Sequence, residues 1–132
     1  MKKILLDTNA LALMFEENLD VFDELENVLG EAYYPIMLLD SLEETLMKCV
    51  KGSFREKRVF SHVLKVIYEK VMLVNPDLDK ELSVDDKILL YALREGCIVV
   101  TGDKELRRRL REKNVSTISY RRSKQGFRVD NP

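Results

Sequence analysis

Two aspartates of this chain come at the ends of apolar runs, and two acidic pairs lie near the starts of helical segments. Crowded carboxylates raise one another's pKa unless a cation neutralises them. Ligands that offer only oxygen atoms suit Mg²⁺ or Mn²⁺ better than Zn²⁺. Such a cation turns a bound water into a nucleophile and stabilises charge on a phosphate. The candidates are Asp7, Asp103, either Glu43 or Glu44, and either Asp85 or Asp86.

Short apolar runs of the buried-strand kind alternate along the chain with helical segments. This alternation predicts an α/β fold, a parallel sheet with right-handed crossovers. Ligands of such sheets bind beyond the carboxyl ends of the strands, which is where Asp7 and Asp103 would project. The predicted strands are residues 3–6, 34–39, 71–74, 97–100 and 115–120.

The predicted helices begin at polar caps and end near glycines. The helix that starts after the second strand and the helix that precedes the fourth bring the remaining acids to the same rim. Four carboxylates from four distant segments would then converge. The predicted helical regions are 11–29, 42–50, 59–68, 83–95 and 104–112.

Each acid also has a purely structural explanation. Asp7 and Asp103 can cap the helices that follow them, and Glu44 can close a capping box with Ser41. Asp86 can favour the first turn of its helix through the helix dipole. Capping does not, however, require four acids at one edge of a sheet, so together they favour a site.

Length and composition place the chain among ordinary globular domains. Its 132 residues suit one domain, expected over 1–120 with a basic tail over 121–132, and 45% of them are apolar. No apolar run approaches the roughly 20 residues of a membrane helix. The run after Lys3 is also too short for a signal peptide, so we expect a cytoplasmic protein without a membrane partner.

The net charge of −1 hides an asymmetry along the chain. Residues 1–103 hold 12 Lys and Arg against 20 Asp and Glu, whereas residues 104–132 hold 10 against 3. This pattern favours a protein that gathers metal ions at one place and a polyanion beside it. A solvated helix face is the competing explanation. The candidate RNA-binding residues are Arg107, Arg108, Arg109, Arg111, Arg121, Arg122 and Lys124.

The ordered set of acidic motifs resembles the PIN-domain family. The resemblance spans residues 3–120 and is closest to the branch of ribosomal-RNA-processing PIN nucleases and small archaeal relatives. Toxin PIN ribonucleases are also related to it. The motifs are Leu5-Leu6-Asp7-Thr8-Asn9, Ser41-Leu42-Glu43-Glu44-Thr45, Asp85 to Ala92, and Ile98 to Leu106.

The resemblance implies a three-layer sandwich with a central parallel sheet of four or five strands flanked by helices. It also implies a Mg²⁺- or Mn²⁺-dependent ribonuclease. In the family, a leucine commonly follows the second acid, and Thr45 occupies that position in this chain. With Thr45 at that position, the preceding residue Glu44 is preferred to Glu43 as the second acid. The catalytic metal ligands are then Asp7, Glu44, Asp86 and Asp103, with Glu43 and Asp85 as second choices and Thr8, Asn9 and Thr101 in supporting roles.

Three functions are compatible with these residues. The leading hypothesis is an endoribonuclease with an RNA substrate, either in RNA processing with a ribosome-assembly partner or as a toxin blocked by an antitoxin. The alternative is a non-catalytic module that binds RNA or protein. A receiver-like phosphatase is disfavoured because the third strand ends in Asn75-Pro76 rather than in a phosphorylatable aspartate. A homodimer could use the apolar helix 59–68.

Overall fold

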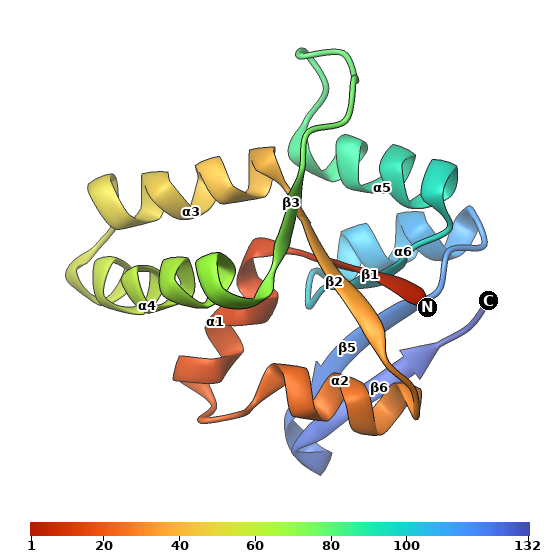
Figure 1. Ribbon diagram of the computed structural model, residues 1–132, viewed down its shortest axis with the longest axis horizontal. Helices are drawn as coiled ribbons and strands as arrows, with labels where there is room; N and C mark the ends of the chain where they lie inside the picture. Colours follow the sequence, from red (N-terminus) through yellow and green to blue (C-terminus); the bar gives the residue numbers. More distant parts are fainter.

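A six-stranded sheet forms the centre of the computed structural model, which describes residues 1–132 (Figure 1). The strand order is β3-β2-β1-β4-β5-β6, and β1 to β5 are parallel. The order reverses between β1 and β4, and such a switch point is where open α/β sheets bind ligands. The strands are β1 (Lys2–Leu6), β2 (Tyr33–Leu38), β3 (Met72–Val74), β4 (Ile98–Val100), β5 (Thr117–Arg121) and β6 (Gly126–Asp130).

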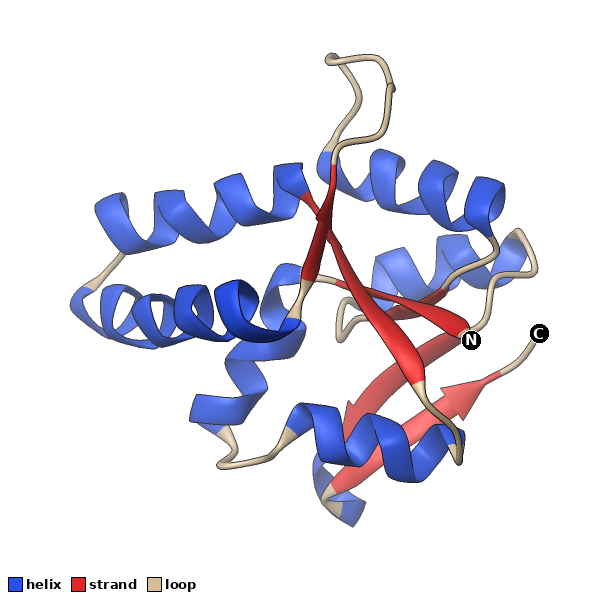
Figure 2. Ribbon diagram, viewed as in Figure 1, coloured by secondary structure: helices blue, strands red, loops and turns tan.

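Six α-helices and one short 3-10 helix connect the strands (Figure 2). Most begin at the polar residues that the sequence offers as caps, such as the Ser53 capping box with Glu56 and the Ser83 cap. No helix is long and apolar enough to cross a membrane. The helices are α1 (Thr8–Glu16), α2 (Val21–Leu29), α3 (Leu39–Lys51), α4 (Phe54–Lys70), α5 (Val84–Glu95), α6 (Lys104–Glu112) and the 3-10 helix η1 (Arg122–Lys124).

Apolar residues on both faces of the sheet create the expected three layers. In β1, Ile4 and Leu6 pack with α1, α2 and α4, whereas Leu5 points to the other face and packs with α5 and α6. This alternation follows from the two-residue period of a strand. The predicted fold class is therefore confirmed, with helices on both sides of a mostly parallel sheet.

The segment that the sequence analysis treats as a basic tail is part of the sheet. Residues 126–130 form β6, which pairs antiparallel with β5. Gln125 takes a left-handed backbone conformation with φ of 48° and closes the turn before it. The sheet thus gains an edge strand beyond the four or five that were predicted.

The helix expected to offer a dimer face is used within the chain. Phe60, Val63 and Ile67 of α4 are buried in the core, whereas Phe54 and Tyr68 at its two ends are strongly exposed, at 84% and 91%. The buried side of α4 therefore belongs to the core of the chain.

Candidate active site

Asp7 occupies the switch point of the sheet. Its backbone N–H donates to the carbonyl oxygen of Val100 on β4, 3.0 Å away, so the ends of the two central strands meet at this residue. The side chain is only 9% exposed. Oδ1 accepts from the N–H of Thr8 at 2.8 Å, and this bond caps α1. Burial raises the pKa of the Asp7 carboxyl, and the charge of Asp103 raises it further.

Thr101 connects Asp7 with the second strand-end acid. Its buried hydroxyl donates to Oδ2 of Asp7 at 2.8 Å and accepts from the N–H of Asp103 at 3.1 Å. Asp103 then caps α6, because its Oδ1 accepts from the N–H of Leu106 at 2.9 Å. The hydroxyl of Thr101 therefore links the carboxylate of Asp7 to the backbone of Asp103.

Glu44 reaches the same region from α3. The hydroxyl of Thr8 lies 3.3 Å from Oε1 of Glu44 and 3.2 Å from the carbonyl oxygen of Ser41. Burial raises the pKa of the Glu44 carboxyl, and the charge of Asp7 raises it further. Since α3 begins at Leu39, Ser41 lies inside the helix and forms no capping box with Glu44. The structural explanation for Glu44 is therefore wrong.

The neighbouring acid Glu43 shares one hollow with Glu44 but also lines a second one that Glu44 does not reach. It lines a hollow of about 550 Å³ between the start of α3 and the loop 75–82, together with Asp40 and Lys87. Glu44 does not line this hollow, and Glu43 has no contact with Thr8. The contacts thus agree with the preference for Glu44.

Asp85 and Asp86 lie in opposite electrostatic surroundings. Burial raises the pKa of the Asp85 carboxyl, and the charges of Asp7 and Asp103 raise it further. Asp86 instead bonds to the guanidinium of Arg109, which holds its pKa below the ordinary value, as does its hydrogen bonding with Ser83. These surroundings favour Asp85 over Asp86 as the metal ligand, in contrast to the preference taken from the sequence. The charges of Asp7 and Asp103 act on Asp85, whereas Asp86 is paired with Arg109 and links α5 to α6.

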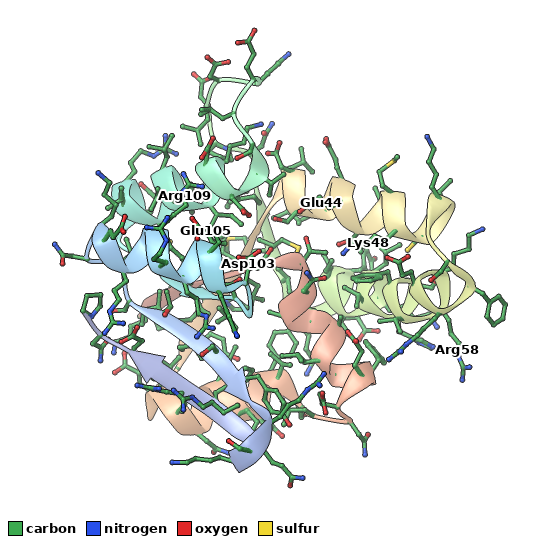
Figure 3. All side chains as sticks on the ribbon, turned by 180° about the vertical axis from the view of Figure 1, so that it is seen from behind. Glu44, Lys48, Arg58, Asp103, Glu105 and Arg109 are labelled. Carbon is green, nitrogen blue, oxygen red and sulfur yellow. The ribbon has the colours of Figure 1, made fainter.

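The site thus combines four carboxylates from α3, α5 and the ends of β1 and β4. Figure 3 shows Glu44 and Asp103 on either side of the start of α1. No three His, Cys, Asp or Glu side chains are close enough to form a ready-made metal cluster. The donor set nevertheless fits Mg²⁺ or Mn²⁺, because it offers only oxygen atoms and because neighbouring negative charges raise the pKa of Asp7, Glu44 and Asp85.

Asn9 and Lys48 lie at the edge of this cluster. Nζ of Lys48 donates to Oδ1 of Asn9 at 3.1 Å, so the predicted supporting residue Asn9 holds a lysine rather than a carboxylate. The sequence analysis did not select Lys48. It stands four residues after Glu44, and side chains at this spacing share one face of a helix, a signal that the sequence does contain.

Most of the predicted RNA-binding arginines are paired with acids. Arg108 bonds to Glu105 and Glu112 on its own helix, and Arg107 is half-buried beside Ser119. The other pairs are Arg109 with Asp86, Arg111 with Asp130, and Arg122 with Glu17. Charge partners therefore occupy much of the basic surface predicted on α6.

The turn between β5 and β6 holds cations without acidic partners. Arg121, Lys124 and Arg128 line a hollow of about 460 Å³ with Gly126 and Phe127, and none of the three makes an ion pair with a carboxylate. Because β5 runs parallel to β1 and β4, Arg121 at its end lies at the same edge of the sheet as the acids.

Comparison with known proteins agrees with this geometry. Residues 4–123 match the family described as "PIN like domain". The chain belongs to the PIN-like domain family. The resemblance carried by the acidic motifs is thereby confirmed, and the match ends two residues into η1.

Two known proteins are similar to this PIN-like chain over most of its length. It is 31% identical to ribonuclease VapC4 of Methanocaldococcus jannaschii over 128 residues, with 94% of each chain covered. The solved structure of the PIN domain endonuclease Utp24 superposes with a TM-score of 0.79 at 21% identity, covering 98% of this chain and 92% of that one. The second likeness supports the PIN-like fold.

Proposed function

We propose that this protein is a metal-dependent endoribonuclease that hydrolyses phosphodiester bonds of RNA. The observation that carries the proposal is the convergence of Asp7, Glu44 and Asp103 at the switch point of the sheet, where the hydroxyls of Thr8 and Thr101 connect them. The charges of Asp7 and Asp103 also act on Asp85. Capping alone would not bring these charges together. The likeness to a ribonuclease over 94% of the chain supports RNA as the substrate.

The four carboxylates would hold Mg²⁺ or Mn²⁺, and Asp85 takes the place first given to Asp86. When bound, the cation activates water and stabilises the charge that develops on the phosphate. Thr101 and Thr8 hold the carboxylates of Asp7 and Glu44 in place through their hydroxyls. Such partners keep a ligand in one orientation.

The substrate would be bound mainly by the turn between β5 and β6. Arg121, Lys124 and Arg128 lack acidic partners, and the end of β5 lies at the edge of the sheet that carries the acids. A backbone phosphate is the natural partner for cations of this kind. The arginines of α6 contribute less, because their charges are already paired.

The proposal names the reaction, RNA cleavage, and does not choose between RNA processing and a toxin as its biological role. A basic tail over 121–132 would slightly favour RNA processing over a toxin, but residues 126–130 form a strand of the sheet. Both an antitoxin and a ribosome-assembly partner remain hypotheses for this chain.

The direct test is cleavage of labelled single-stranded and hairpin RNA by the purified protein in Mn²⁺, Mg²⁺ and EDTA. Asp7→Asn and Asp103→Asn serve as site variants, and Asp23→Asn on the exposed start of α2 serves as the matched control. We expect metal-dependent cleavage by the wild type and the control and none by the site variants. RNA binding without cleavage under any condition would favour the non-catalytic module.

A further inference from the structure

Lys48 places a positive charge beside the carboxylate cluster. It follows Glu44 by four residues on α3, so both side chains leave the same face of the helix. Figure 3 shows the two residues side by side. Its charge offsets part of the rise in pKa that burial causes at the carboxyls of Asp7 and Glu44. The lysine thus acts on both acids without binding either.

The direct partners of the Lys48 ammonium are neutral. Nζ donates to Oδ1 of Asn9 at 3.1 Å and lies 4.7 Å from the centre of the Phe60 ring. It forms no ion pair with a carboxylate, unlike Lys87, which binds Asp40, and Arg109, which binds Asp86. An ammonium group has three donors, and Asn9 accepts from one of them. The ammonium group of Lys48 is therefore held in position and keeps two N–H donors for another partner.

A hollow of about 410 Å³ opens beside this ammonium. Its lining is acidic apart from Lys48 and two apolar side chains, and it consists of Asp40, Glu43, Glu44, Met47, Lys48 and Val84. An RNA strand that approaches these acids meets repulsion between its phosphates and the carboxylates. Lys48 supplies the one positive charge in the lining, at the point where the strand would meet Glu44.

We infer that Lys48 binds a phosphate oxygen of the RNA backbone at the edge of the carboxylate cluster and so positions the strand for cleavage. The inference rests on the proposed function. Asn9 and Phe60 hold the ammonium for this contact, and their neutrality leaves its charge to the substrate. The competing role is structural, in which Lys48 only joins α3 to α1 and α4 through these two partners.

Steady-state cleavage of single-stranded RNA in Mn²⁺ separates the two roles. We expect Lys48→Met to lower kcat/KM by roughly 10- to 100-fold, mostly through KM, because a hydrogen bond between charged groups is lost. Lys48→Arg should restore most of the activity. Lys51→Met removes a charge from the same helix, at an exposed lysine without a partner, and should leave kcat/KM unchanged.

The salt dependence of RNA binding separates the two roles further, because it changes only if Lys48 contacts a phosphate of the RNA. The binding constant K for RNA is measured in the Asp103→Asn background. On adding Lys48→Met, the magnitude of the slope of log K against log salt should decrease by about 0.7, the change for one phosphate contact with a single strand. An unchanged slope, or an equal change with Lys51→Met, would overturn the inference. If the wild type cleaves RNA and Lys48→Met cleaves it equally well, this inference alone fails. If the wild type neither cleaves nor binds RNA, the proposed function fails with it.

Discussion

The hydroxyl of Thr101 donates to Oδ2 of Asp7 across 94 positions of the sequence, at 2.8 Å and with both residues buried. The bond joins the carboxyl ends of β1 and β4, the two strands on either side of the switch point. The same hydroxyl accepts from the N–H of Asp103. One side chain therefore holds two candidate metal ligands at a fixed separation.

Thr101→Val should weaken Mn²⁺ binding and RNA cleavage by roughly 10- to 100-fold, as loss of a ligand's supporting hydrogen bond commonly does. Valine has nearly the same shape, so the fold should persist. Thr101→Ser keeps the hydroxyl and is the control. Metal titration and initial cleavage rates give the two measurements, and full activity of the valine variant would show that the bond has no functional part.

Asp85→Asn and Asp86→Asn should change stability in opposite directions in EDTA. The pKa of the Asp85 carboxyl is raised in the folded protein, so its ionisation opposes folding as pH rises above about 4. Asp85→Asn should therefore raise the Tm at pH 7. The pKa of the Asp86 carboxyl is lowered, so its ionised form stabilises the folded protein when pH lies above the ordinary pKa of an aspartate. Asp86→Asn should therefore lower the Tm at pH 7.

The difference for Asp85 should disappear as pH falls below about 4, because its carboxyl is then protonated in both the unfolded and the folded chain. The difference for Asp86 should shrink below about pH 4 and disappear only when pH falls below the lowered pKa of the folded protein. Thermal melts over pH 3 to 8 give the comparison. Equal shifts of the same sign for the two variants would contradict the different surroundings assigned to them.

The ion pair of Lys87 with Asp40 should hold α3 and α5 together at the site. Nζ lies 2.7 Å from Oδ2, and the side chains are 11% and 24% exposed respectively. Asp40→Ala leaves the more buried charge unpaired and should lower the free energy of unfolding by about 1–3 kcal/mol. Lys87→Met leaves Asp40, the more exposed of the two side chains, without a charge partner, so it should lower the free energy of unfolding by a smaller amount. Urea denaturation measures both, and the reverse order would contradict the burial argument.

Replacing cations of the β5–β6 turn should weaken RNA binding more than replacing those of α6. For Arg121→Gln with Lys124→Gln we expect the slope of log K against log salt to fall by about 1.4, or about 0.7 for each phosphate contact. Arg108→Gln with Arg111→Gln removes the same charge from residues already paired with acids and should change the slope little. A larger effect from the α6 pair would restore the helix as the main contact.

The arrangement of the strands and of the strand-end acids could be predicted from the sequence. Apolar runs followed by Asp7 and Asp103 fix the edge of the sheet at which both project, whatever the details of packing. No strand was predicted at β6, because Phe127 and Val129 alternate with polar residues over only five positions, too short a pattern beside a run of cations. Antiparallel pairing with β5 gives that segment its structure.

The choice within the acidic pair could not be made from the sequence. Consecutive residues of a helix point about 100° apart, so the rotation of α5 against the sheet decides which carboxyl meets Asp7. The pairing of Arg109 with Asp86 depends on how α5 and α6 pack, and no local pattern shows it. By contrast, the pairing of Arg108 with Glu105 and Glu112 follows from their spacing on one helix, a pattern that the sequence does contain.

Isothermal titration calorimetry with Mn²⁺ shows whether the four carboxylates at the switch point form one metal site. We expect binding with near-integer stoichiometry by the wild type, its loss in Asp7→Asn and Asp85→Asn, and its retention in Asp86→Asn. Absence of binding by the wild type, or binding by Asp7→Asn as tight as that of the wild type, would contradict this expectation.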